Sequence, residues 1–174
     1  MSGTKTFLII IGISILIACG HLRANKTSEV RAIPENTTND IEKLLDNTLP
    51  FVEDLIKIYG EFFPIASAIK ANDSIVHIGT YNGNERPSSD QLIADLKKSL
   101  KAKKEEYTTI AIFYNVRVID PNTNVKTDAI AVFVETKKEK VAFTFYYPYT
   151  LTKDNKFTTS NSWKNTKDKE IFKE

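Results

Sequence analysis

The sequence has few of the residues that carry most catalytic and metal chemistry. It contains one cysteine, one methionine and two histidines among 174 residues. A single cysteine excludes a disulfide within the chain, so the folded part must be stabilised by its apolar core. The chain has no C-x-x-C pair, no H-x-x-x-H pair and no glycine-rich nucleotide loop. We therefore expect neither a metal nor a cofactor.

Nucleophilic catalysis is also poorly supported. The chain has no G-x-S-x-G motif. His77 lies in "SIVHIGTY", where it alternates with Val76 and Ile78, so we expect it to point outward from a strand. His21 falls in a polar stretch near the N-terminus. A general base needs a partner within about 3 Å, and no spacing here provides one. We predict no catalytic residue and favour binding over catalysis.

An excess of one charge is lacking as well. The chain has 24 Lys and Arg against 22 Asp and Glu, which gives a net charge of +2. This balance argues against nucleic acid as the partner, because such proteins usually have a strongly basic footprint. One predicted helix does carry a basic face, formed by Lys97, Lys98, Lys101, Lys103 and Lys104. Glu105 and Glu106 balance it, so a solvated face is favoured over contact with anionic head groups.

The chain has only one long apolar run, from Phe7 to Cys19. A helix that crosses a bilayer needs about 20 apolar residues, whereas runs of about 10–14 are typical of signal peptides or buried helices. Lys5 precedes the run and a polar stretch follows it. This order of charge, short apolar run and small-residue boundary is the layout of a secretory signal.

The boundary Leu16-Ile17-Ala18-Cys19 resembles the lipobox of bacterial lipoproteins: an aliphatic, a variable and a small residue before cysteine. The resemblance implies that a diacylglyceryl group is attached to the thiol of Cys19 and that a signal peptidase cuts between Ala18 and Cys19. Two acyl chains suffice for stable anchoring. The expected location is therefore a membrane of the bacterial cell envelope, facing the periplasm or the exterior. An ordinary cleaved signal and an uncleaved anchor are the alternatives.

This boundary divides the chain into three parts. Residues 1–18 are predicted to be the signal peptide. Residues 19–38 are polar, with few large apolar side chains, and are predicted to be a flexible tether with a root-mean-square reach of about 25 Å. Residues 39–174 are predicted to form a single α+β domain.

Two helices are predicted in this domain. The first runs from Asn39 to Tyr59, and Pro50 must kink or restart it. Its apolar stripe consists of Ile41, Leu44, Leu45, Thr48, Val52, Leu55, Ile56 and Tyr59. The second runs from Ser89 to about Glu105, after a capping box of Ser88 and Gln91. Leu92, Ile93, Leu96 and Leu100 form its inner stripe.

Five strands are predicted. A hairpin joins two short strands through Asn72-Asp73, and the remaining strands are Thr108–Ile119, Thr127–Glu135 and Lys140–Tyr149. Short connections favour antiparallel pairing. From Leu151 the chain is polar, and Trp163, Ile171 and Phe172 are the only strong anchors of this tail. The expected fold is α+β, with a five-stranded antiparallel sheet and two main helices in the order α-β-β-α-β-β-β.

This order resembles the roadblock or profilin-like arrangement, in which helices pack on a central antiparallel sheet. The pattern "FFPIA…YNGNERPSS…YNVRV…TDAIAV…YYPY" is also similar to that of a small domain found in bacterial proteins. Neither resemblance implies an activity, since one fold supports many functions.

A polar cluster is predicted on the long strands. If the turn pairs Asp120 with Val125, Arg117 lies opposite Asp128 as a cross-strand ion pair, with Asn115 on the same face. This is either a register-setting salt bridge or a polar pocket on a sheet face without helices. The opposite face is more continuously apolar, and both helices are expected there: it carries Ile110, Ile112, Tyr114, Val116, Val118, Ala129, Ala131 and Phe133.

The aromatic run "FTFYYPYT" is the other candidate for recognition, because tyrosine is enriched at interfaces. Alternate aromatic residues of the run share one face of a strand. Packing of some of these rings in the core and of the others at its rim would therefore also explain the run without a ligand. The loop 82–87 is a further candidate surface. The residues predicted to bind are Asn115, Arg117, Asp128, Tyr146, Tyr147 and Tyr149.

The sequence therefore favours a protein-binding module of the envelope, of the inhibitor or immunity type. An enzyme or ligand carrier with a site around Asn115, Arg117, Asp128 and Tyr146 is one alternative. A structural envelope component is the other.

Overall fold

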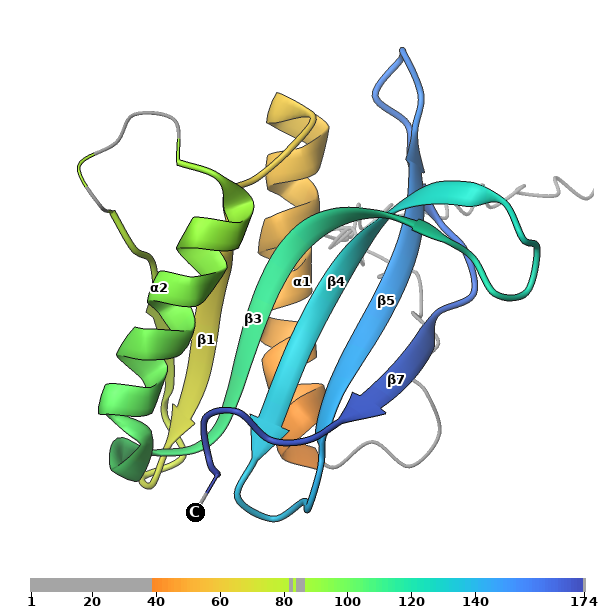
Figure 1. The fold of residues 1–174 in the computed structure, drawn as a ribbon. Helices are drawn as coiled ribbons and strands as arrows, with labels where there is room; N and C mark the ends of the chain where they lie inside the picture. Colours follow the sequence, from red (N-terminus) through yellow and green to blue (C-terminus); the bar gives the residue numbers. More distant parts are fainter. Residues whose placement is uncertain (1–38, 82, 84–86, 174) are drawn as a thin grey trace, which may run out of the picture. The chain divides into compact units, whose positions relative to one another are not determined.

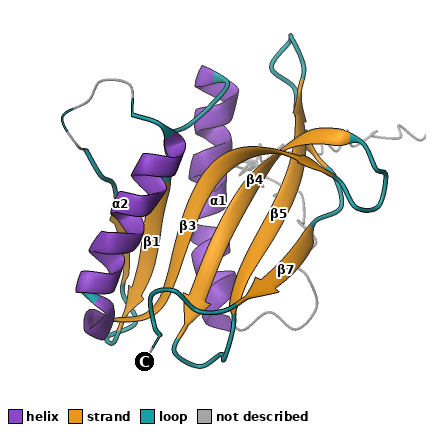
Figure 2. Ribbon diagram, viewed as in Figure 1, coloured by secondary structure: helices purple, strands orange, loops and turns teal. Residues whose placement is uncertain are grey.

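The structure, a computed structural model, describes residues 39–81, 83 and 87–173. The predicted signal peptide, the tether, the cleavage site at Ala18 and Cys19, and His21 lie outside the described residues. The described chain is an α+β fold with two main helices and an antiparallel sheet (Figures 1 and 2). Its elements are α1 (Asn39–Tyr59), β1 (Ile65–Lys70), β2 (Ile75–Ile78), α2 (Ser89–Ala102), η1 (Lys104–Glu106), β3 (Tyr107–Ile119), β4 (Lys126–Thr136), β5 (Ala142–Leu151), β6 (Phe157–Thr159) and β7 (Trp163–Lys167).

The sheet has more strands than predicted. In the described chain it has seven, in the order β2-β1-β3-β4-β5-β6, with β7 also paired to β5. The prediction of five strands was wrong because the polar tail folds back on β5. β6 pairs with the end of β5 at Tyr149–Leu151, and β7 pairs with its start at Ala142–Tyr146. Both added strands are short and largely exposed, so they lack the apolar alternation that identifies a strand in a sequence.

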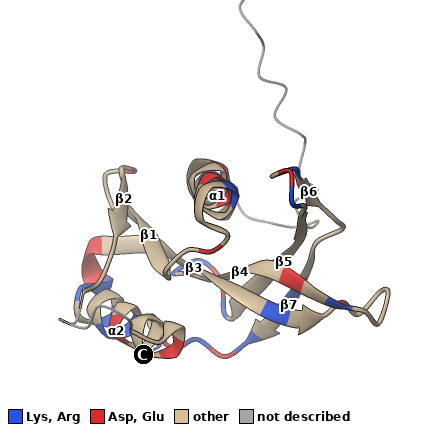
Figure 3. Cartoon of the chain, turned by 90° about the horizontal axis from the view of Figure 1, so that it is seen from above, with Lys and Arg blue, Asp and Glu red and all other residues tan. Residues whose placement is uncertain are grey.

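The sheet curls around α1. Figure 3 shows the two edge strands, β2 and β6, rising on either side of this helix. The helix buries Leu44, Leu49 and Ile56 against Phe113 of β3 and Phe145 of β5. Pro50 is exposed within the helix. Tyr59 was predicted to belong to the buried stripe but is 71% exposed, because it ends the helix beyond the edge of the core.

The second helix packs on the opposite face. α2 buries Leu96 and Leu100 against Ile110 and Ile112 of β3, and Ser88 caps it by accepting a hydrogen bond from the N–H of Gln91. Figure 1 shows α1 behind the sheet and α2 in front of it, over β1. The expectation that both helices share the face of Ile110 was therefore wrong for α1. Both faces of the central strands are apolar, and such strands do not specify by alternation which face a helix covers.

The C-terminal segment closes the same face as α2. Ile171 is buried in the α2-side core and Phe172 packs against it. The carboxylate of Glu135, itself fully buried, accepts hydrogen bonds from the backbone N–H groups of Glu170, Ile171 and Phe172 at 2.6–3.1 Å. A buried carboxylate is tolerated when donors of this kind surround it. The predicted tail anchors thus have a defined place in the fold.

No helix in the part of the chain that the structure describes is long and apolar enough to cross a membrane.

Candidate functional site

The predicted ion pair lies on the long β3–β4 hairpin. The N–H of Asp120 donates to the carbonyl of Val125, which fixes the turn and places Arg117 opposite Asp128. This register was predicted from the sequence and is confirmed. Nη1 of Arg117 lies 3.8 Å from Oδ1 of Asp128, and the two side chains are 63% and 47% exposed. A pair this long and this exposed sets register but adds little stability.

Tyr149 extends this cluster onto β5. It is the cross-strand partner of Asp128, and its hydroxyl donates a hydrogen bond of 3.1 Å to Oδ1 of Asn115. Burial raises the pKa of Tyr149, the bond to Asn115 lowers it in part, and the charge of Asp128 raises it further. The ring also stacks on Phe157 with the centroids 5.2 Å apart. Tyr149 therefore anchors β6 to the sheet.

The sheet separates the predicted binding residues. Tyr147 is the cross-strand partner of Ile130, which is in turn the partner of Asn115, so Tyr147 lies with the ion pair on the α1 side of the sheet and is buried. Tyr146 lies on the opposite face, where it stacks on Trp163 at 5.2 Å. The alternative site around Asn115, Arg117, Asp128 and Tyr146 is therefore not brought together.

The face that holds Tyr146 has no helix over part of its area. Tyr114, Ala131, Tyr146 and Trp163 are consecutive cross-strand partners from β3 to β7. Figure 1 shows that α2 lies over β1 and leaves β4, β5 and β7 uncovered by a helix. We call Tyr114, Val116, Tyr146 and Trp163 the aromatic sheet face; all four are half-buried. Burial, and then the neighbouring Tyr146 and Glu170, raise the pKa of Tyr114 to about 12, so it is a neutral hydroxyl at physiological pH.

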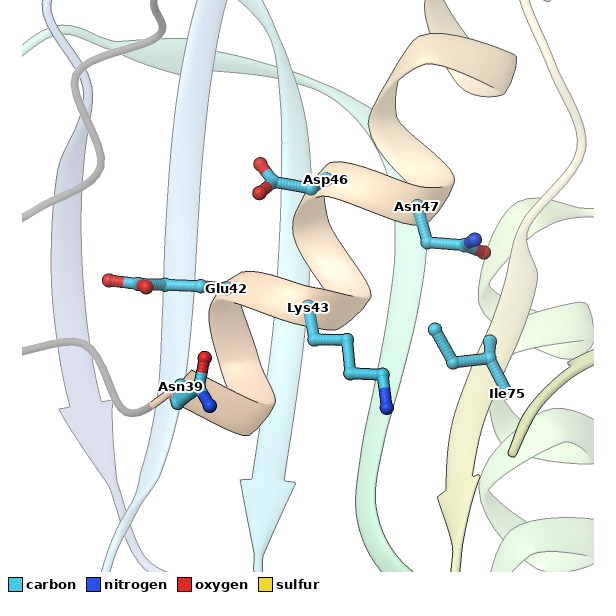
Figure 4. Close-up of a pocket in the computed structure, with 6 residues that line it drawn as sticks. All are labelled: Asn39, Glu42, Lys43, Asp46, Asn47 and Ile75. Atoms are coloured by element: carbon cyan, nitrogen blue, oxygen red, sulfur yellow. The ribbon is translucent and has the colours of Figure 1, made fainter. Parts of the chain in front are cut away.

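Two open depressions lie elsewhere, and the sequence indicated neither. One, of about 530 Å³, is lined by Asn39, Glu42, Lys43, Asp46, Asn47 and Ile75 (Figure 4). The other, of about 390 Å³, is lined by Thr80, Tyr81, Asp95, Lys98, Ser99 and Ala102. Lys43 is held at the rim of the first by Asp73, whose carbonyl accepts a hydrogen bond of 2.9 Å from its ammonium group. Neither lining contains histidine or cysteine.

In the residues that the structure describes, no group of three or more His, Cys, Asp or Glu side chains is placed to hold a metal ion. His77 is exposed, as predicted. The predicted basic face of α2 is partly used within the fold. Lys97 pairs with Glu170 at 2.7 Å and its Nζ lies 4.9 Å from the ring centroid of Phe133, while Lys104 donates to the carbonyl of Lys173.

The α1 helix has a second apolar side that the sequence analysis missed. Phe51 and Ile58 are 53% and 68% exposed, and Phe63 just beyond the helix is also exposed. Asn47, Phe51 and Ile58 are spaced i, i+4 and i+11, so they share one face of the helix. This spacing can be read from the sequence. It was missed because these residues lie next to the core stripe on the helix and look like part of it.

Comparison with known proteins adds no relative: no family model, no curated protein and no solved structure matches the chain.

Proposed function

We propose that the chain is a lipid-anchored lipoprotein of the bacterial cell envelope, attached through Cys19, whose domain is a protein-binding module of the inhibitor or immunity type. The lipobox resemblance supports the anchor. The distribution of side chains supports binding, because Tyr146 and Trp163 are stacked on a part of the sheet that no helix covers. We also propose that the domain has a roadblock or profilin-like fold, and this resemblance concerns the fold and not the function.

One observation carries the binding module: the aromatic sheet face. Tyr and Trp are enriched at protein interfaces, where they contribute disproportionately to affinity. Here Tyr146 and Trp163 are stacked at an interplanar angle of 16°, on adjacent paired strands. A partner would meet side chains that are already ordered, which lowers the entropic cost of binding.

The rival site supports catalysis or ligand carriage less well. Arg117 and Asp128 are largely exposed and already paired with each other, and Tyr146 lies on the other face of the sheet. A carrier or an enzyme would need a concave pocket that gathers these groups. A structural envelope component is the third function. For such a protein, cross-linking should recover many weakly bound neighbours instead of one partner.

The binding proposal is tested by cross-linking the full-length protein in its own membranes, followed by affinity capture and mass spectrometry. We expect one stoichiometric protein partner that is lost in the double variant Tyr146→Ser, Trp163→Ser. The matched control is Ile119→Ser, which removes an exposed apolar side chain from the end of β3 and should keep the partner. Capture that is equal in all three proteins would contradict the proposal.

The anchor is tested separately. The N-terminal peptide of the captured protein should begin at an acylated Cys19, and Cys19→Ser should leave the chain uncleaved and unlabelled by a tagged fatty acid. Cleavage of the Cys19→Ser variant at the same boundary would identify an ordinary signal peptide and remove the lipid anchor from the proposal. That result would not contradict the proposal that the aromatic sheet face binds a protein.

A further inference from the structure

The aromatic sheet face is bordered by two ammonium groups. Phe133 follows Ala131 by two residues on β4, so both side chains lie on the same face of the sheet. Ala131 is the cross-strand partner of Tyr146 of the aromatic sheet face. The Nζ atoms of Lys97 and Lys167 lie 4.9 and 4.5 Å from the ring centroid of Phe133. Both charges are therefore held one rung away from the aromatic rings.

One exposed carboxylate is shared by these two ammonium groups. Glu170 accepts a hydrogen bond of 2.7 Å from Lys97 through Oε2 and one of 2.5 Å from Lys167 through Oε1. We call these three residues the charged border; their side chains are between 28% and 44% exposed, so a partner can reach them. The nearby carboxylate of Glu135 is buried and accepts backbone N–H groups of the C-terminal segment. The charged border therefore carries one positive charge in excess, and each ammonium group has three N–H donors.

The tyrosine next to the charged border is also a donor. Burial, and then the nearby Tyr146 and Glu170, raise the pKa of Tyr114 to about 12. Its hydroxyl therefore stays neutral at physiological pH and can donate a hydrogen bond to an anion. Val116 and Pro148, in the next rung away from the lysines, are apolar. This part of the sheet thus offers hydrogen-bond donors to an anionic group and apolar side chains to the neighbours of that group.

We propose that the partner of the aromatic sheet face is an acidic protein segment, in which an Asp or Glu side chain binds the lysines of the charged border and neighbouring apolar residues pack on Tyr146 and Trp163. This inference rests on the proposed binding function and names the chemistry of the partner. Charge complementarity favours this occupant, because a basic segment would bring like charges together. The two lysines are already held over Phe133, so binding costs little side-chain entropy.

The chemistry of the partner is tested by selecting a displayed library of random peptides on the full-length protein in detergent. We expect the enriched peptides to share an acidic residue beside apolar or aromatic ones, and to lose binding to the double variant Tyr146→Ser, Trp163→Ser. Enriched peptides that need both rings but carry no acidic residue would contradict the inference and leave the proposed function intact. A lack of enrichment over the double variant would contradict both.

Two variants that break the same ion pair separate recognition from folding. Lys97→Gln and Glu170→Gln both remove the Lys97–Glu170 contact, but the first lowers the charge of the border by one and the second raises it by one. Lys97→Gln should weaken binding of the most enriched peptide by about threefold to fivefold, and Glu170→Gln should strengthen it by a similar factor. Fluorescence anisotropy measures both, and thermal unfolding checks that each variant is folded. If both variants weakened binding, or neither changed it, the charged border would be structural only and the inference would be wrong.

The position of the charge is tested with a matched variant. Lys153→Gln removes the same charge from the exposed connection between β5 and β6, so it should leave the dissociation constant unchanged. The selected peptide with its Asp or Glu replaced by the amide should bind the wild type and Lys97→Gln equally, because the charge that couples to Lys97 is gone. A loss of affinity in Lys153→Gln as large as that in Lys97→Gln would indicate attraction by net charge alone and would overturn the proposed contact.

Discussion

The two faces of the sheet are closed in different ways. On one face α1 covers an almost wholly apolar layer, in which Thr48 and Ser67 form a buried hydrogen bond of 3.0 Å. On the other face α2 is shorter, and the closure is completed by a C-terminal segment held by the buried carboxylate of Glu135. The first face is therefore stabilised mainly by burial of apolar area, and the second depends in addition on a few polar contacts.

This difference separates global stability from local stability. Removal of apolar volume beneath α1 should weaken the whole domain, since β3, β4 and β5 all contribute to that layer. Loss of a polar contact to the C-terminal segment should release that segment first. The four predictions below are ordered from the largest expected effect to the smallest.

Truncation of the core beneath α1 should have the largest effect. Phe113 is fully buried in the α1-side core, and Phe113→Ala should lower the free energy of unfolding by about 3–5 kcal/mol. Urea denaturation followed by circular dichroism measures this change. Phe51→Ala is the matched control, because the same substitution at an exposed ring should cost far less. Similar losses in the two variants would contradict the view that the apolar layer beneath α1 carries the stability of the domain.

Removal of the Glu135 carboxylate should have the next largest effect. Glu135→Ala takes the acceptor from three consecutive backbone N–H groups, of which that of Ile171 is buried. We expect a loss of about 2–3 kcal/mol in stability, limited because the segment can leave the sheet and regain water. Amide hydrogen exchange should accelerate at residues 168–173 while α1 stays protected.

The control for this variant is Glu106→Ala, which removes an exposed carboxylate and should change neither stability nor exchange. If Glu135→Ala accelerated exchange equally in α1 and in the C-terminal segment, the two faces would unfold as one unit. The contrast between global and local stability would then be wrong.

The same contrast explains how much of the fold was predictable. Local patterns predicted the α1 stripe, the N-cap at Ser88 and the Arg117–Asp128 register, and these are confirmed except that Tyr59 of the stripe is exposed. β6, β7 and the contacts of Glu135 were not predicted, because they form through backbone groups that every residue carries, and the donors to Glu135 lie 35 to 37 positions further along the chain. A carboxylate within a strand does not reveal from its sequence that a distant segment will supply its donors.

The candidate site was predictable in composition but not in arrangement. Tyr146, Tyr147 and Tyr149 were selected for their aromatic rings, yet only Tyr146 belongs to the aromatic sheet face. Its stacking partner Trp163 was identified as an anchor of the tail, and its strand was not. Alternation along β5 shows that neighbouring tyrosines point to opposite faces. How much of the second face is covered by a helix depends on where α2 packs, and this tertiary contact cannot be predicted from local alternation.

Acid should weaken the docking of the C-terminal segment. Burial alone would raise the pKa of Glu170, but hydrogen bonds from Lys167 and Lys97 outweigh it and hold this pKa below its usual value. The stabilisation is therefore present above the unfolded pKa of about 4.3 and is lost as the pH falls through the lower folded value. Hydrogen exchange at residues 168–173, compared between about pH 6 and about pH 3 after correction for intrinsic rates, should show less protection in acid.

Glu170→Gln separates this effect from that of the other carboxylates. The variant lacks the titrating group, so the extra loss of protection below about pH 4 should be absent from it. If the variant and the wild type lost protection in parallel, a different carboxylate would control the segment. Because Glu170 is 39% exposed, we expect the effect to be smaller than that of Glu135→Ala.

The Arg117–Asp128 pair should have the smallest effect of all. Both side chains are largely exposed and their closest charged atoms are 3.8 Å apart, so Arg117→Gln should change the free energy of unfolding by less than about 0.5 kcal/mol. A double-mutant cycle with Asp128→Asn, measured by urea denaturation, gives the coupling energy directly. A coupling well above 1 kcal/mol would indicate that the end of the hairpin is more rigid and less hydrated than its exposure implies. A small value would mean that the Asp120–Val125 turn and the apolar rungs next to it hold the register, and that the charges at this end of the sheet are free to meet an external partner.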